Sequence, residues 1–219
     1  IFIVDKNISR LYKSRLDKLL NSGRIIEIEA IEENKSLDQF PKYIHSLVKL
    51  NVKRGCTLVG VGGGIIQDIT CFLAATMMRG LPWIFYPTTL LAQADSCIGS
   101  KSSINSGNIK NIIGTFTPPC EVIIDVEFLD TLEQKDITSG IGEMLKVHAI
   151  DSPESFDKIS ADYKSIISDI NVMEEYIYSS LLIKKYIIEV DEFDQNIRNV
   201  MNYGHSFGHA IQSATDYLI

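Results

Sequence analysis

The sequence predicts an α/β domain with a mainly parallel sheet, followed by an all-helical domain. Apolar runs of strand length alternate with helical patterns in the first part of the chain, which is typical of βαβ units. A glycine-rich turn, GVGGG, follows one of these apolar runs and opens a helix. Beyond residue 131 only helical patterns follow. We therefore expect a Rossmann-like α/β domain over 1–130 and a helical domain over 131–219.

The order of the expected elements follows from hydrophobic periodicity. Amphipathic spacing predicts helices over 9–21, over 36–50, where a serine opens the helix, and over about 65–78. Five apolar runs predict the strands of the sheet, in the order IFIVD, RIIEIEAI, CTLVGVGGG, PWIFYP and EVIID.

Bulk properties exclude several classes of function. A net charge of −7 argues against a general nucleic-acid binder, because such domains usually carry a basic excess. No apolar run approaches the ~20 residues needed to span a bilayer, and the start lacks the layout of a secretory signal. Four cysteines lie apart without CxxC spacing, which favours a reduced, cytoplasmic setting. The chain begins on a strand and ends at DYLI, so both ends look cut.

The glycine-rich turn has two interpretations. Gly63 and Gly64 open a helix, where backbone N–H groups and the helix dipole favour a nucleotide phosphate. The pattern is not a full GxGxxG, so a plain tight turn between strand and helix remains equally open. Asp68 in the same helix is either a site residue or a solvated, capping carboxylate.

A long, mostly uncharged segment follows the fourth strand and is expected to be a loop. It contains polar side chains that suit an anionic, hydroxyl-rich ligand, although a solvated loop is also compatible with this composition. These side chains are Thr88, Thr89, Asp95, Lys101, Asn105, Lys110 and Asn111.

The helical part carries two polar patterns. Glu143 and Lys146 are three residues apart, which suits a shared helix face and is often only a surface ion pair. In RNVMNYGHSFGHAIQ, four polar residues fall within about 60° of arc if the segment is one helix. They are Arg198, Asn202, His205 and His209. The HxxxH spacing suits a metal, but Ser206 takes the place of the glutamate of an HExxH protease.

Several linked motifs together resemble the 3-dehydroquinate synthase family and its relatives, the sugar-phosphate cyclases. The resemblance runs from Asp5 to the end of the chain. Its motifs are EENKSL, GGGIIQDITCFLAATMMRG, YPTTLLAQADSCIGSKSSIN, KNIIGTF, FLDTL, GEMLK and KKYIIEVDEFDQNIRNVMNYGHSFGHAI.

The resemblance implies an NAD site, a substrate site and a divalent metal, Zn²⁺ or Co²⁺. The residues implied to contact NAD are Asp5, Glu32, Lys35, Gly63, Gly64, Asp68, Thr88, Thr89, Phe128 and Thr131. Those implied to surround the substrate are Asp95, Lys101, Lys110, Asn111, Lys146, Lys184, Arg198, Asn202 and His209, while Arg79 is implied to reach the phosphate site of a homodimer partner. Glu143 and His205 are implied to be metal ligands, with a third expected just past Ile219.

The implied reaction converts 3-deoxy-arabino-heptulosonate 7-phosphate to 3-dehydroquinate. One hydroxyl is oxidised by NAD, phosphate leaves by elimination, the ketone is reduced again, and an aldol step closes the ring. The alternatives are a cyclase of the 2-epi-5-epi-valiolone or 2-deoxy-scyllo-inosose synthase type, a metal-dependent polyol dehydrogenase and a non-catalytic truncated paralogue. Two departures from the family pattern, Ser100 and the pair Ser106-Gly107, lie in the expected substrate loop and leave the exact sugar phosphate open.

Overall fold

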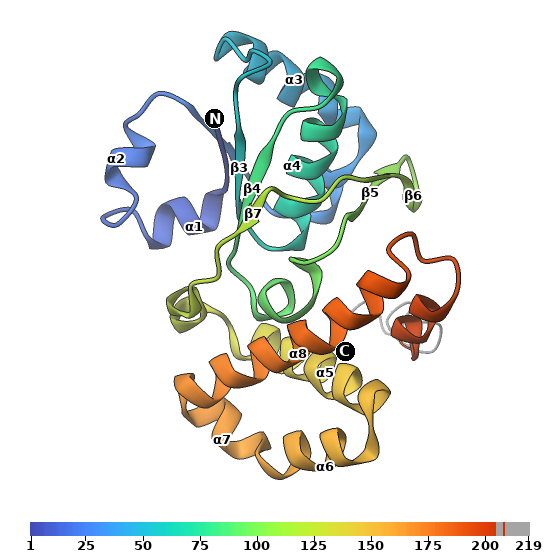
Figure 1. Ribbon diagram of the computed structural model, residues 1–219. Helices are drawn as coiled ribbons and strands as arrows, with labels where there is room; N and C mark the ends of the chain where they lie inside the picture. Colours follow the sequence, from blue (N-terminus) through green and yellow to red (C-terminus); the bar gives the residue numbers. More distant parts are fainter. Residues whose placement is uncertain (205–207, 209–219) are drawn as a thin grey trace. The chain divides into compact units, whose positions relative to one another are not determined.

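The computed structural model describes residues 1–204 and Gly208, and Figure 1 shows its elements. The chain divides into two compact units, Ile1–Ile141 and Gly142–Ile219. The division falls within helix α5 (Gln134–Asp151), later than the change of sequence pattern near residue 130. One reason is that Gly140 of α5 packs against Leu90 of the first unit, where an added Cβ would lie 2.5 Å from Leu90 Cγ.

The first unit is built around a parallel sheet of five strands in the order β2-β1-β3-β4-β7. A parallel α/β sheet of this kind was predicted, and the β7 strand is shorter than expected. The strands are β1 (Phe2–Asp5), β2 (Ile25–Ile28), β3 (Leu58–Gly62), β4 (Trp83–Pro87) and β7 (Glu121–Val122).

Helices cover both faces of this sheet (Figure 1). On one face, Ile8 and Tyr12 pack with Val4, Val61 and Phe128. On the other face, α4 packs along β3, and Phe72 of α4 makes an edge contact with Phe40 of α3. The helices are α1 (Lys6–Leu11), α2 (Asp17–Leu20), α3 (Phe40–Lys49) and α4 (Gly64–Thr76), with short 3₁₀ turns η1 (Glu32–Lys35), η2 (Leu37–Gln39), η3 (Met77–Arg79) and η5 (Val126–Thr131).

Two local predictions for this unit were wrong. The helix expected over 9–21 is split into α1 and α2, since α1 ends at Leu11 and Tyr12 is its C-cap. The segment expected to be a loop forms the π-helical turn η4 (Ala92–Ser96) and an antiparallel hairpin of β5 (Lys101–Ser106) and β6 (Ile109–Phe116). Its strands are rich in Ser, Asn, Lys and Gly, so their apolar alternation is weak.

The second unit is helical throughout its described part. It contains the larger part of α5 together with α6 (Pro153–Ala161), α7 (Tyr163–Ser168), α8 (Ile170–Val190) and the 3₁₀ turn η6 (Ile197–Asn202). Val147, Ile187 and Met201 form an apolar cluster among them. Within the described residues, no helix is long and apolar enough to cross a membrane.

The sequence predicted that Arg198, Asn202 and the two histidines lie on one continuous helix. This prediction was wrong, because the helical turn that contains Arg198 stops before Gly204. The 3₁₀ turn ends at Asn202, and Gly204 has φ = +79°. This left-handed conformation favours glycine, because an L side chain would clash with the backbone there. Gly204 therefore ends the turn, and the Gly208 N–H then donates to the Gly204 carbonyl at 2.8 Å.

His148 is buried in the second unit and should make its stability depend on pH. Its Nδ1 donates to the Met144 carbonyl at 2.8 Å, so its Nε2 accepts from the Ser179 hydroxyl at 3.1 Å. Burial lowers the pKa of this imidazole below its usual 6.5. The folded state therefore disfavours the proton that the unfolded chain binds readily. We expect the contribution of His148 to be complete above pH ~6.5 and to be lost progressively as the pH falls below that value.

Urea unfolding at pH 7.5 and pH 5.5 measures this effect. His148→Gln removes the titrating group and should reduce the loss of unfolding free energy between the two pH values. His45→Gln is the matched control, because His45 is exposed on α3. An equal pH dependence in wild type and His148→Gln would contradict the prediction.

Candidate active site

A pocket of ≈460 Å³ opens where the strand order of the sheet reverses. The chain leaves β1 for β2 on one side and later returns to β3 on the other, which creates a crevice at the carboxyl ends of β1 and β3. Ligands of open α/β sheets bind in such crevices. The pocket brings together seven residues that the sequence assigned to a cofactor: Asp5, Gly63, Gly64, Thr88, Thr89, Phe128 and Thr131.

The glycines allow the backbone to line this pocket closely. A Cβ on Gly63 would lie 2.9 Å from Thr89 Cγ2. This distance is too short for two carbon atoms, so Thr89 would have to move to admit any side chain at position 63. A Cβ on Gly64 would meet nothing within 4 Å, so Gly64 faces open space at the first turn of α4. No side chain caps this helix, whose N-cap is Gly63. Its first N–H groups are thus available to an anion, and the cradle fits a dinucleotide pyrophosphate.

Asp5 lies at the end of β1, the strand next to β3, and lines the same pocket as the glycine turn. Its side chain accepts a hydrogen bond from the Asn7 backbone N–H at 2.9 Å and caps α1. Burial raises the pKa of Asp5, while the N–H groups of Asn7 and Ala30 oppose this shift. A carboxylate oxygen that lines this pocket can accept hydrogen bonds from ribose hydroxyls.

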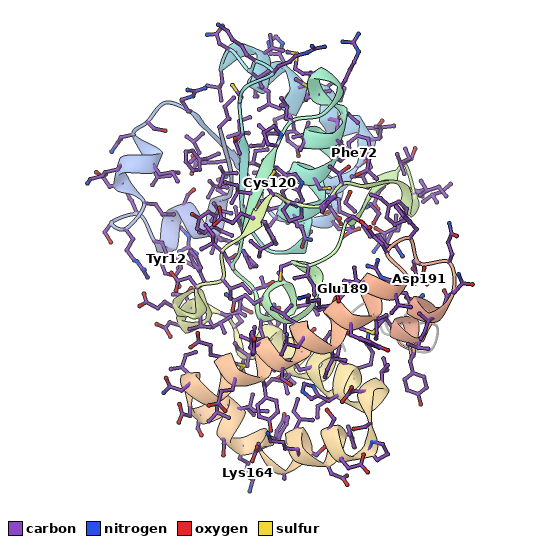
Figure 2. The ribbon with its side chains drawn as sticks, in the orientation of Figure 1. Tyr12, Phe72, Cys120, Lys164, Glu189 and Asp191 are labelled. Carbon is purple, nitrogen blue, oxygen red and sulfur yellow. The ribbon has the colours of Figure 1, made fainter. Side chains whose placement is uncertain are left out.

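Tyr12 supports the part of the pocket that carries Phe128 and Thr131, and sequence reasoning missed it. Its ring makes an edge contact with Phe128 at 5.0 Å between centroids. Its hydroxyl donates to the Glu127 carbonyl at 2.9 Å and lies 3.0 Å from Thr131 Oγ1 (Tyr12 is labelled in Figure 2). No sequence signal links Tyr12 to residues more than 100 positions away; only the fold brings them together.

Three further residues assigned to the cofactor form a charged network rather than part of the pocket lining. Lys35 Nζ lies 3.0 Å from Asp68 Oδ2, 2.8 Å from Asn111 Oδ1 and 3.9 Å from Glu32 Oε1. Asp68 also accepts from the Ser103 N–H at 3.0 Å, so it is neither a cap nor a solvated carboxylate. Burial raises the pKa of Asp68, while the Lys35 ammonium opposes this shift.

The hairpin places three residues that the sequence assigned to the substrate. Lys101 lies on β5, and Lys110 and Asn111 lie on β6, where Asn111 has φ = +54°. A non-glycine residue in this region is uncommon and costs about 1 kcal/mol or more. Its carboxamide oxygen accepts from both Lys35 Nζ and the Ser103 hydroxyl, and these bonds hold the conformation.

Asp95 lies on the π-helical turn η4, a type of turn found frequently at functional sites. The neighbouring Ser96 exchanges two hydrogen bonds with Gln67 of α4. Gln67 Nε2 donates to the Ser96 carbonyl at 2.5 Å, and the Ser96 hydroxyl donates to Gln67 Oε1 at 2.6 Å. Gln67 therefore anchors the turn that presents Asp95, a role that the sequence did not indicate.

The second unit holds the remaining assigned residues. Glu143 and Lys146 share a face of α5, and Lys146 Nζ lies 2.6 Å from Glu143 Oε1 with both side chains largely buried. Lys184 is buried on α8. Asn202 ends η6. His205 and His209 lie outside the described residues.

Arg198 is held by a tight loop that begins at Asp191, which is labelled in Figure 2. The Asp191 carboxylate accepts from the backbone N–H groups of Gln195, Asn196 and Arg198 at 3.0, 2.7 and 3.1 Å. These N–H groups, that of Gln195 first, hold the pKa of Asp191 below its usual range. The Arg198 guanidinium donates to the Glu192 carbonyl, which orients it. Asp191 and Glu192 were missed by sequence reasoning.

Arg79 lies on a strained turn at the end of η3. Met78 and Arg79 have φ of +52° and +68°, and Gly80 follows at +117°. Two adjacent non-glycine residues in the left-handed region store strain of about 1–3 kcal/mol each, and such strain clusters at functional sites. The turn leaves Arg79 exposed on the surface of the first unit.

Only one of the two implied metal ligands, Glu143, lies in the part of the chain that the structure describes. Among residues 1–204 and Gly208, no group of three or more His, Cys, Asp or Glu side chains could hold a metal ion. Of the two implied ligands, only Glu143 is described, and it is paired with Lys146. The assignment of Glu143 and His205 stays a prediction.

Comparisons with known proteins agree over nearly the whole chain. The family descriptions "3-dehydroquinate synthase N-terminal" and "3-dehydroquinate synthase C-terminal" match residues 25–139 and 140–219. A 3-dehydroquinate synthase from Dehalococcoides mccartyi is 38% identical over 99% of this chain and 62% of the relative. The chain therefore spans less than two thirds of that relative's length.

Two solved structures share the fold. One is a 2-epi-5-epi-valiolone synthase from Streptomyces hygroscopicus with NAD⁺ and Zn²⁺ bound, with a TM-score of 0.88, 24% identity and coverage of 100% of this chain and 63% of that one. The other is a 2-deoxy-scyllo-inosose synthase with a TM-score of 0.84, 24% identity and coverage of 100% and 62%.

Proposed function

The chain belongs to the 3-dehydroquinate synthase family, and from this premise we propose that it forms part of an NAD-dependent, phosphate-eliminating lyase. The substrate would be 3-deoxy-arabino-heptulosonate 7-phosphate and the product 3-dehydroquinate, in the shikimate pathway of aromatic amino acid biosynthesis. The observation that carries the proposal is the pocket at the carboxyl ends of β1 and β3. Its lining includes seven residues that the family resemblance assigns to NAD.

The pocket explains how this chain would hold NAD. The uncapped first turn of α4 and the close approach at Gly63 suit the pyrophosphate, and Asp5 suits a ribose hydroxyl. Phe128, fixed by Tyr12, supplies an apolar surface for a ring of the cofactor. When bound, NAD would supply reversible hydride transfer with the carbon that bears one substrate hydroxyl, whose proton would pass to a base, and the hydride would return to the substrate, so no net reduction accumulates.

The proposed substrate residues fall into two groups, cationic side chains for the anionic groups of the substrate and other polar side chains for its hydroxyl groups. Lysine and arginine side chains neutralise the phosphate and carboxylate, which lowers the cost of binding a dianion and stabilises the leaving phosphate. Lys101 and Lys110 of the hairpin and Lys146, Lys184 and Arg198 of the helical unit supply these cations. Asp95, Asn111, Asn202 and His209 would bind hydroxyl groups, which need both donors and acceptors.

Zinc, or cobalt, is proposed as the metal, with Glu143 and His205 as the ligands that this chain contributes. The solved synthase that carries NAD⁺ and Zn²⁺ supports this choice at the level of the shared fold. Metal analysis of the purified full-length protein beside a His205→Ala variant tests it. An unchanged zinc content in the variant would contradict the assignment.

The substrate is tested by phosphate release. The full-length protein should release phosphate from the acidic heptulosonate phosphate and show no steady-state production of NADH. No release from this substrate would overturn the proposed function. Net NADH formation with a simple alcohol would point to a polyol dehydrogenase instead, and NAD binding without turnover would point to a non-catalytic paralogue.

A sugar-phosphate cyclase acting on a substrate that lacks the carboxylate is the second candidate. Ser100 and the Ser106-Gly107 pair, which depart from the family pattern, favour it because they lie in the segment that carries substrate residues. Ser106 and Gly107 lie at the turn of the β5–β6 hairpin, and Ser100 directly precedes β5. Phosphate release from sedoheptulose 7-phosphate or glucose 6-phosphate, with none from the acidic substrate, would establish this alternative.

We also propose a homodimer in which Arg79 of one copy approaches the phosphate site of the other. The strained, exposed turn that presents Arg79 supports this role. Analytical ultracentrifugation should show a dimer, and Arg79→Ala should raise KM for the sugar phosphate. A fully active monomer would contradict the proposal.

A further inference from the structure

The β5–β6 hairpin contains an asparagine, Asn105, that joins two parts of the polar network. Asn105 is 5% exposed and lies on β5. Its Nδ2 donates to Glu32 Oε1 at 2.8 Å. Its Oδ1 accepts from the Asn111 backbone N–H at 2.8 Å. The Asn105 carboxamide therefore donates one hydrogen bond and accepts another, and both partners, Glu32 and Asn111, are residues assigned to the site.

The two partners of Asn105 come from distant parts of the chain and need external support. Glu32 lies on the short turn η1, which cannot fix a side chain by itself, and 38% of its side chain remains exposed. Asn111 has a left-handed backbone that is unfavourable without a bond to hold it. A backbone bridge between Ser36 and Asn105 brings the end of η1 against β5. From β5 the Asn105 carboxamide reaches Glu32, at the start of the same turn.

We propose that Asn105 is a positioning residue that holds the Glu32 carboxylate for the cofactor's ribose and, through Asn111, couples the cofactor site to the substrate hairpin. The proposal rests on the proposed function and on the contact between Glu32 and NAD that the family resemblance implies, because Glu32 lies beside the pocket rather than in its lining. The bond fixes Glu32 Oε1, and the proposal assigns the second carboxylate oxygen to the ligand. A buried carboxamide bonded at both ends can do this because rotation would leave both of its polar ends unpaired.

Asn105→Asp tests the Glu32 contact with almost no change of shape. The acceptor for the Asn111 N–H remains, whereas the donor to Glu32 becomes a second carboxylate oxygen. Two carboxylates within hydrogen-bonding distance repel each other, so Glu32 should turn away. We expect the dissociation constant for NAD, measured by calorimetry at pH 7.5 on the full-length protein, to rise about tenfold or more. The increase should shrink toward pH 5.5, as one proton becomes shared by the pair.

Asn108→Asp is the matched control. It adds the same charge to the same hairpin, but Asn108 is exposed at the turn between the strands. Its NAD affinity should equal that of wild type at every pH. A merely structural role of Asn105 would lower the melting temperature without creating a pH-dependent loss of NAD affinity. In the double variant Asn105→Asp with Glu32→Gln, the new amide at position 32 can donate to the new carboxylate at position 105. The melting temperature should therefore be higher than that of Asn105→Asp alone.

The outcomes separate this proposal from the proposed function. If wild type binds NAD and both aspartate variants bind it equally well, the positioning role is overturned and the function stands. If wild type does not bind NAD, both are overturned. If Asn105→Asp fails to fold, the double variant decides: recovery of folding supports the contact with Glu32, and no recovery overturns it.

Discussion

Lys146→Ala is expected to abolish phosphate release while leaving NAD affinity nearly unchanged. Lys146 is largely buried on α5, beside Glu143. An ammonium group held in a partly desolvated site stabilises a phosphate or carboxylate far more than it would in water. We therefore expect kcat for phosphate release to fall by about 100-fold or more. Among residues 1–204 and Gly208, those that line the cofactor pocket lie between Asp5 and Asp136, so the affinity for NAD should persist.

Phosphate release and calorimetric NAD binding, measured on the same preparations, check this prediction. Lys185→Ala is the control, because Lys185 is an exposed lysine on α8 that pairs with Glu189 at 3.6 Å (Glu189 is labelled in Figure 2). It removes the same charge from the helical unit and should leave kcat within about twofold. A large loss of NAD affinity in Lys146→Ala would show that this lysine contacts the cofactor instead. Retained turnover would show that it contacts no reacting group.

Asp68→Leu is expected to destabilise the first unit by about 3 kcal/mol. The change removes the carboxylate 3.0 Å from Lys35 Nζ, and the Lys35 side chain is only 9% exposed. A buried ammonium that loses its main partner keeps its desolvation cost without the compensating attraction. The Ser103 N–H loses its acceptor as well. Asn111 and the more distant Glu32 remain beside Lys35, which places the loss at the lower end of the usual range.

Urea unfolding monitored by circular dichroism measures the loss. The double variant Lys35→Met with Asp68→Leu removes both charges and should recover most of the stability, since a buried pair replaced by apolar side chains is often close to neutral. Glu127→Ala is the control for an exposed pair. Glu127 lies 2.6 Å from Arg15 with both side chains more than half exposed, and we expect a change of no more than about 1 kcal/mol. Equal losses from Glu127→Ala and Asp68→Leu would contradict the argument.

The site was predictable from the sequence through the family resemblance, and the motifs that carry it lie on short backbone patterns. Asp5 follows a buried strand, and Gly63 and Gly64 connect another strand to a helix. In a parallel sheet, the carboxyl ends of neighbouring strands meet at one edge, so this pattern already implies a shared pocket. The side chains that support the pocket were not predictable. Tyr12 gives no local signal of its bond to a carbonyl 115 residues away.

The hairpin shows most clearly why the sequence alone was insufficient. Residues 101–116 read as a loop because small polar residues hide the alternation of a strand. Tertiary contacts decide the conformation: Asp68 binds the Ser103 N–H, Lys35 binds Asn111, and Asn105 binds Glu32. A propensity difference of a few tenths of a kcal/mol per residue is outweighed by several buried, charge-assisted hydrogen bonds.

The sequence by itself determined the family, the parallel α/β sheet with its helical second unit, and the residue types of the glycine turn and the pocket wall. The sheet and the helical unit follow from hydrophobic periodicity, and the family and the pocket residues follow from the linked motifs that carry the resemblance; both are properties of short segments. Only the tertiary structure decided that Asp68 is an ion-pair partner of Lys35, that the presumed loop is a hairpin, and that the helix through Arg198 ends before Gly204. The reason is that each of these depends on a contact or a dihedral angle set by residues far away in the chain, which no local pattern encodes.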